Sequence, residues 1–257
     1  MIRQSVKFMD LGQMDYKSAW DFQESLLQNN VRIKSLIRNR EVAVNTLDVG
    51  NSPRSGSPDQ ILSTRNYLLF VEHPPVLTLG KTGDVSNVLL SEESLHEKGI
   101  QFFRTNRGGD ITFHGPQQIV GYPILDLEKF DTDIGHYLRN LEEVIIQTLA
   151  DYGIKAGRSK GETGVWIDPD IKGKERKICA IGVRCSRWIT MHGFAFNVNT
   201  DLSYFNYIIP CGIQNKQVTS LQKECGREME LEEVKEKVKQ NFEKVFNVRL
   251  TDRDDYS

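Results

Sequence analysis

Cys211 has the sequence setting of a reactive thiol. It lies between Pro210 and Gly212, and this combination fits a tight turn that presents a side chain instead of burying it. Lys177 opens an apolar, strand-like run that continues to Val183. An amine close to a thiol promotes the thiolate, which is the nucleophilic form. The two residues are far apart in the chain, so only the fold can bring them together.

The direction of the Lys177 side chain follows from strand geometry. Successive side chains of a strand alternate between its two faces, which places Lys177 on the same face as Cys179 and Ile181. A lysine on an apolar face is partly withdrawn from water, which suits it to proton transfer. Lysines at strand ends commonly point to water instead, and spacing alone leaves both interpretations open.

A glycine-rich stretch, residues 107–116, reads RGGDITFHGP. Adjacent glycines let backbone N–H groups approach a ligand closely. The stretch is neither the GxGxxG pattern of dinucleotide sites nor a P-loop, which needs a lysine followed by a hydroxyl residue. A glycine hairpin without a ligand is the alternative. His114 is the histidine best placed to touch a substrate, and a Cys–His pair that uses it also stays open.

Composition excludes several classes of protein. The chain has 257 residues, 39% apolar and 26% charged, with a net charge of −2. We expect one domain over 1–257 with a core at about 10–246, and no basic field for nucleic acid. No apolar run reaches the ~20 residues that span a bilayer, and no signal core follows the N-terminus. The four cysteines and the histidines fit no metal template, so we expect free thiols, no metal and a cytoplasmic protein.

The hydrophobic pattern predicts an α+β fold. Asp133 and Gly153 mark the two ends of one helix. Three late strands joined by short loops predict an antiparallel meander, and residues 50–60 predict a surface loop. We expect helices at 15–38, 133–152 and 231–246, and strands at 67–72, 76–79, 110–114, 118–126, 163–168, 176–185 and 189–199.

Five segments, in this order, resemble the lipoyl(octanoyl) transferase family. They are EHPPVLTLG at 72–80, RGGDITFHGP at 107–116, KICAIG at 177–182, MHGFAFNVN at 191–199 and IPCGI at 209–213. The resemblance covers about residues 10–245. It implies a fold of the biotin/lipoate protein ligase type, with a mixed or antiparallel sheet and flanking helices.

The resemblance also implies an activity, which is transfer of an octanoyl group from acyl carrier protein to a lysine of a lipoyl domain, without a cofactor. The acceptors would be lipoyl domains of 2-oxoacid dehydrogenase E2 subunits and the H protein of glycine cleavage, and we expect a monomer without nucleic-acid or membrane partners. Cys211 matches the acyl-accepting thiol of the family, and Lys177 matches the lysine that activates it. The positions that match the acyl-substrate segments are Arg107, Gly108, Gly109, Asp110, Ile111, Thr112, Phe113, His114, Ala180, Ile181, Gly182, Gly193, Phe194 and Ala195.

Two positions depart from the family pattern, and three other functions compete with it. The family usually carries glycine where this chain has Gln117, and alanine where it has Cys179. An ATP-dependent lipoate ligase would activate a free acid as an adenylate and would not need Cys211. A non-catalytic module would bind acyl or lipoyl groups without reaction. A Cys–His thioesterase would release free octanoate.

Overall fold

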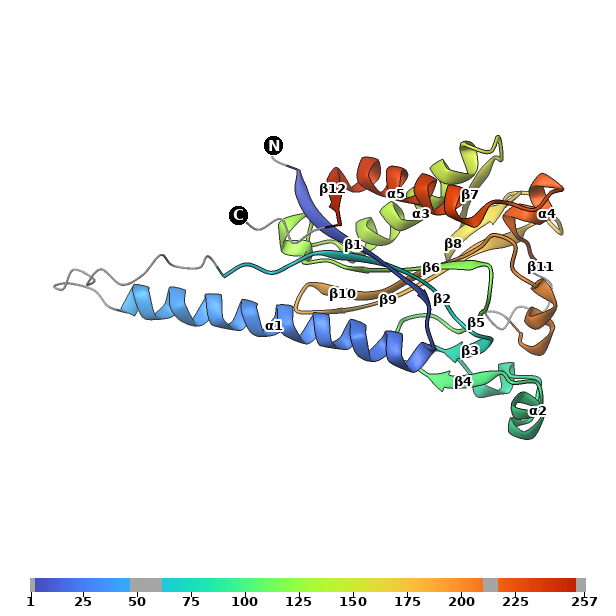
Figure 1. The fold of residues 1–257 in the computed structure, drawn as a ribbon, viewed down its shortest axis with the longest axis horizontal. Helices are drawn as coiled ribbons and strands as arrows, with labels where there is room; N and C mark the ends of the chain where they lie inside the picture. Colours follow the sequence, from blue (N-terminus) through green and yellow to red (C-terminus); the bar gives the residue numbers. More distant parts are fainter. Residues whose placement is uncertain (1–2, 47–61, 210–216, 253–257) are drawn as a thin grey trace.

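A large mixed sheet forms the centre of the protein, and a small sheet lies beside one end of it (Figure 1). The computed structural model describes residues 3–46, 62–209 and 217–252. In spatial order the large sheet contains β12 (Val248–Thr251), β1 (Gln4–Gln13), β2 (Tyr67–Glu72), β6 (Gln118–Ile124), β10 (Ile189–Asn197), β9 (Arg176–Ser186), β8 (Glu162–Ile167) and β7 (Ala156–Ser159), with β11 (Gln217–Val218) also paired to β9. The small sheet contains β4 (Gln101–Arg104), β3 (Val76–Leu79) and β5 (Ile111–His114).

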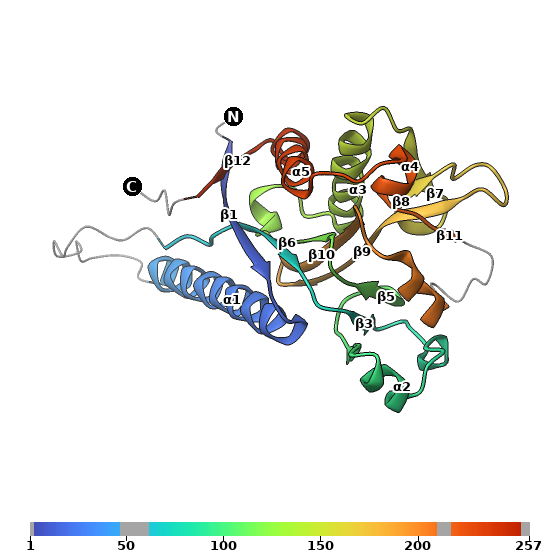
Figure 2. The same cartoon turned by 45° about the vertical axis from the view of Figure 1, so that its right-hand side comes forward.

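Helices cover both faces of the large sheet (Figures 1 and 2). The long helix α1 (Tyr16–Thr46) lies along one face, and α3 (Ile134–Ala150) and α5 (Leu231–Phe246) lie along the other. Short helices α2 (Glu92–Glu97) and α4 (Leu221–Cys225) and 3₁₀ turns at Val85–Asn87, Leu127–Lys129 and Leu202–Tyr207 complete the chain's regular structure in the described ranges. This arrangement confirms the α+β class. Within those ranges, no helix combines the length and the apolarity that crossing a bilayer requires.

The ends of α3 show how local sequence sets an element. The Asp133 side chain accepts a hydrogen bond from the backbone N–H of His136, which satisfies one of the free donors of the first turn. Gly153 follows the helix with a φ of +74°, a conformation that costs glycine little. The buried residues between them recur at helical spacing, as do those of α5, and the two helices also contact each other through Tyr137 and Phe246.

Most predicted elements are confirmed. The strands at 67–72 and 76–79 and the helix at 231–246 have the expected bounds, and β8, β9 and β10 pair as an antiparallel meander. Arg187 and Trp188, both with positive φ, form the turn between β9 and β10. The first helix continues beyond Arg38 to Thr46. The expected loop at 50–60 lies outside the described residues.

Strands β6 and β10 approach each other closely at Gly193. A Cβ atom on Gly193 would overlap the carbonyl oxygen of Gly121 and lie 2.7 Å from Cδ of Pro123. Only a residue without a side chain therefore allows this close approach.

We predict that Gly193→Ala destabilises the protein by about 3 kcal/mol, because the added methyl group forces the two strands apart. Gly12→Ala is the control, since Gly12 has a φ of +60° with open space around it. It should cost only the left-handed strain of about 1 kcal/mol. Urea unfolding followed by circular dichroism measures both, and equal losses would contradict the steric argument.

Candidate active site

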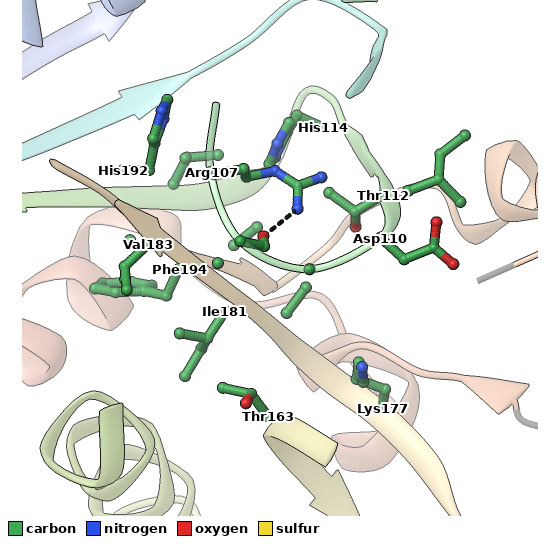
Figure 3. A pocket seen from close by; sticks show the side chains of 18 of the residues that line it. Arg107, Asp110, Thr112, His114, Thr163, Lys177, Ile181, Val183, His192 and Phe194 are labelled. Carbon is green, nitrogen blue, oxygen red and sulfur yellow. Dashed lines mark hydrogen bonds between the residues drawn. The ribbon is translucent and has the colours of Figure 1, made fainter. Parts of the chain in front are cut away.

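A cavity of about 600 Å³ lies where the large sheet, the small sheet and the loop 107–110 meet (Figure 3). Lys177 lines it, together with nearly all of the positions that match acyl-substrate segments. The exception is Phe113, whose ring lies in the core of the small sheet and stacks on Tyr204 with ring centroids 4.6 Å apart. The lining positions are Arg107, Gly108, Gly109, Asp110, Ile111, Thr112, His114, Ala180, Ile181, Gly182, Gly193, Phe194 and Ala195.

The cavity exists because β8 accompanies β9 over only part of its length. The two strands pair from Arg176 to Cys179 and then separate. The next N–H of β8, that of Gly164, donates instead to Oε1 of Glu142 on α3, at 3.0 Å. Beyond Cys179, the edge of β9 is therefore not paired with β8. At this edge the Gly108 N–H donates to the carbonyl oxygen of Val183 at 2.9 Å.

The loop 107–110 is held in place by a buried arginine. The guanidinium of Arg107 donates to the backbone oxygen of Thr78 at 2.7 Å, to its hydroxyl at 3.0 Å, and to the Gly108 oxygen at 3.0 Å. Gly182 allows the loop to lie directly on β9, since a Cβ atom there would be 2.7 Å from the Gly108 oxygen. The glycines of this region therefore serve close backbone packing around the cavity.

Lys177 lies half-buried between β8 and the cavity. Its ammonium nitrogen is 4.6 Å from the ring centroid of Trp166, a geometry in which the aromatic face attracts the cation. Gly164 has a φ of +126°, and a Cβ atom there would be 3.5 Å from Cε of Lys177. The lysine stem thus runs past a strand position where glycine leaves room for it. Lys177 and Ile181 both line the cavity, whereas Cys179, which was expected on the same strand face, is buried in the core and does not line it.

Three buried histidines lie at or near the cavity, and all are neutral at pH 7. Burial lowers the pKa of His73 to about 4 and that of His192 to about 3, and it lowers the pKa of His114 well below the ordinary value. His114 contacts Gln118 Oε1 at 3.1 Å and the Thr78 hydroxyl at 3.3 Å through its two ring nitrogens. His114 would have to break one of these contacts to act as a base.

Cys211 lies outside the described residues, but residues on both sides of segment 210–216 line the cavity. Phe205 before it and Val218 after it are lining residues, and Val218 pairs directly with Lys177 in the β11–β9 ladder. Burial raises the pKa of Cys179 far above that of an ordinary thiol. It also raises the pKa values of Cys185 and Cys225. None of these three described thiols is set up to ionise.

Several cavity residues were not predicted from sequence, among them Gln118 and Asn197. Both are buried polar side chains in strands whose other residues are mostly apolar, and that contrast is the signal that could have found them. Tyr16, Tyr122 and Thr163 also line the cavity. Within the described ranges, no cluster of His, Cys, Asp or Glu side chains has the arrangement of a metal site.

Gln117 occupies a position where the backbone favours glycine. Its φ is +61°, a left-handed conformation that glycine adopts at little cost, which explains the glycine of the family pattern at this position. The carbonyl oxygen of Gln117 accepts from the Asn199 N–H and the Thr200 hydroxyl, each at 3.1 Å, and its N–H donates to Glu72 at 2.9 Å. These contacts hold the residue in the left-handed conformation.

Sequence comparison identifies related proteins over nearly the whole chain. Residues 56–243 match the family model of the lipoyl protein ligase A/B catalytic domain. A protein of Christiangramia forsetii named octanoyltransferase is 53% identical over 250 residues, which are 97% of this chain and 99% of that protein. An octanoyltransferase of Flavobacterium psychrophilum is 56% identical over 247 residues, or 96% of this chain and 98% of the relative.

Comparison of folds finds proteins named lipoate protein ligases. A bipartite lipoate protein ligase from Thermoplasma acidophilum superimposes with a TM-score of 0.66 at 15% identity, covering 97% of this chain and 87% of that one. A lipoate-protein ligase A bound with ATP gives 0.63 at 14% identity, covering 98% and 89%. At such low identity the likeness establishes the fold and not the reaction.

We predict that stability falls with pH below about 6.5 because of the buried histidines. The unfolded chain gains protons there, whereas folded His73 resists protonation down to about pH 4. The free energy of unfolding should be constant above pH 6.5 and decrease below it by about 1.4 kcal/mol per pH unit for each such histidine. Urea unfolding between pH 7.5 and 5 tests this. His73→Gln should flatten the slope, the exposed control His96→Gln should not, and parallel curves for all three proteins would refute it.

We predict that Cys179 resists alkylation in the folded protein, because only the thiolate reacts and burial disfavours it. Iodoacetamide treatment at pH 8 followed by peptide mapping should leave Cys179 unmodified until urea is added. Cys225, which is partly exposed, is the internal control. Native-state labelling of Cys179 as fast as that of Cys225 would contradict the prediction.

Proposed function

This chain belongs to the lipoyl protein ligase A/B catalytic-domain family and is an acyltransferase, and from that premise we propose that it transfers an octanoyl group through a thioester on Cys211. The donor is octanoyl-acyl carrier protein. The acceptor is a lysine of a lipoyl domain, in 2-oxoacid dehydrogenase E2 subunits and the glycine-cleavage H protein. The product serves lipoate biosynthesis in the cytoplasm.

The convergence of distant segments on one cavity carries this proposal. Lys177, the loop 107–110 and the strands β9 and β10 all contribute lining side chains or backbone. On one side the lining is apolar, formed by Ile134, Leu138, Ile181, Val183 and Phe194. An eight-carbon tail in such a space gains about 0.8 kcal/mol for each methylene that it buries.

The chemistry proceeds in two balanced steps. In the first, Cys211 attacks the thioester carbon as a thiolate, with its proton held on the Lys177 ammonium, and the carrier thiolate leaves and takes that proton. One thioester replaces another, so the step needs no ATP. In the second, the neutral amine of the acceptor lysine attacks the acyl-enzyme. An amide forms, the Cys211 thiol is regenerated, and the favourable conversion of thioester to amide drives the transfer forward.

Each tetrahedral intermediate carries a negative oxygen that needs hydrogen-bond donors. Backbone N–H groups at the uncovered edge of β9 suit this role. The Val183 carbonyl points to that edge, where it accepts from Gly108, and strand geometry directs the N–H of Ile181 to the same side. We propose the Ile181 N–H as one donor and the loop 107–110 as the source of another.

Intact-mass analysis tests the proposal. After incubation with octanoyl-acyl carrier protein, the wild type should gain one octanoyl group, and an apo lipoyl domain should then remove it. Cys211→Ala should gain none, and Lys177→Met should acylate about 10²–10⁴-fold more slowly. Cys179→Ala, which removes the buried thiol nearest to Lys177 in sequence, should behave like the wild type. An octanoyl adduct on Cys211→Ala would refute the proposal.

The same experiment separates the competing functions. A ligase would modify the lipoyl domain only with ATP and free octanoate, and would tolerate Cys211→Ala. A thioesterase would release octanoate without any acceptor. A binding module would retain the ligand and form no adduct.

A further inference from the structure

Asn197 connects the cavity wall to Thr219, the residue that directly follows β11. Its side chain is 4% exposed and lines the cavity. Its amide nitrogen donates to the carbonyl oxygen of Thr219 at 3.0 Å, and its amide oxygen accepts from Gln118 at 2.8 Å. Gln118 in turn contacts His114, so the connection extends through the wall toward the loop 107–110.

Thr219 uses three polar groups to hold three neighbours. Its N–H donates to the carbonyl oxygen of Lys177 at 2.9 Å, its carbonyl oxygen accepts from Asn197, and its hydroxyl donates to Glu224 at 2.5 Å. The residue is fully buried. Thr219 is therefore fixed directly against the backbone of Lys177, the residue that transfers the proton in the proposed function.

An ion pair closes the outer side of this arrangement. Arg176, the neighbour of Lys177, donates to both oxygens of Glu224 at 2.7 and 2.6 Å and to Asp168 at 2.6 Å. A bidentate pair of this kind restricts geometry as well as adding energy. Arg176 also pairs with Gln217 in the β11–β9 ladder, so the same residue holds β11 and the helix that follows it.

Strand β11 needs these side-chain contacts because it has only two residues, Gln217 and Val218. A ladder this short offers few backbone hydrogen bonds to fix its register on β9. The chain enters β11 from segment 210–216, which contains Cys211. An error in the register of β11 would therefore displace Gln217, the first described residue after that segment, relative to Lys177.

We propose that Thr219 and Glu224, together with Asn197 and Arg176, are positioning residues of the acyl transfer, which lock β11 in register beside Lys177. The inference rests on the proposed function. It adds Thr219 and Glu224 to that function, and neither of these two residues lines the cavity. We expect the rate of acylation to depend on these side-chain contacts, and the binding of octanoyl-acyl carrier protein not to depend on them.

Thr219→Val is the main test, because it removes the hydroxyl and keeps the shape. Single-turnover acylation should be about tenfold slower, with the KM for octanoyl-acyl carrier protein within twofold of the wild type, and Thr219→Ser should restore the rate. Thr200→Val is the matched control. Thr200 is also buried and makes one hydroxyl bond, to the Gln117 oxygen, away from β11. Its acylation rate should be unchanged.

A double-mutant cycle with Lys177→Met distinguishes positioning from general destabilisation. If Thr219 acts by placing β11 beside Lys177, then Thr219→Val should slow acylation less than twofold once Lys177 is already replaced. Additive effects would overturn the inference, as would equal slowing by Thr200→Val or a raised KM with an unchanged rate. All rates are compared at a temperature where circular dichroism shows each variant folded.

Glu224→Gln tests the same inference if Thr219→Val does not fold. Glu224 is only partly buried and lies on a five-residue helix, so its replacement leaves the core intact. This variant keeps an oxygen for Thr219 and weakens the pair with Arg176, and it should slow acylation without raising KM. A wild-type rate would overturn the inference. Octanoylation of Cys211→Ala would instead refute the proposed function, and the two failures are distinct.

Discussion

The incomplete pairing of β9 is the constraint on which the cavity depends. A strand in the middle of a sheet normally satisfies its backbone on both sides, and a strand with an open edge must find other partners. Here β8 leaves β9 after Cys179 because the Gly164 N–H is taken by a fully buried carboxylate, Glu142. Arg139 and Arg158 contact that carboxylate at 2.8 and 2.9 Å. The charge is compensated, and the opening between the strands is a stable feature of the fold.

Buried polar groups line this opening, and nearly every contact that they make crosses between strands. Arg107 joins the loop to β3, His114 joins β5 to β6, Gln118 joins β6 to β10, and Asn197 joins β10 to Thr219, the residue after β11. Such groups cost free energy unless they are paired. Because the partners lie on different strands and on the segments beside them, these hydrogen bonds depend on how the strands are aligned. The polar wall therefore specifies the alignment of the strands around the cavity in a way that an apolar wall would not.

The sequence predicted the elements with strong local patterns and missed those that depend on distant partners. The buried run Tyr67–Glu72 and the amphipathic helix Leu231–Phe246 carry their signal within a few residues. Strand β1 is half-exposed and pairs in parallel with β12, at the opposite end of the chain, and no local pattern encodes that partner. For the same reason Lys177 could be singled out by its place on a strand, whereas its contact with Trp166 follows from the pairing of the two residues across β8 and β9.

Cys179 shows why a lysine nearby is not sufficient to make a nucleophile. The positive charge of Lys177 lowers the pKa of Cys179, but the effect of burial is larger and leaves the thiol protonated. Solvation therefore outweighs attraction at this position. A cysteine that is to ionise beside Lys177 must remain partly hydrated, which a position inside a central strand does not allow. A residue carried on a connecting segment, between a proline and a glycine, can meet both conditions, and among the four cysteines of the chain only Cys211 has that setting.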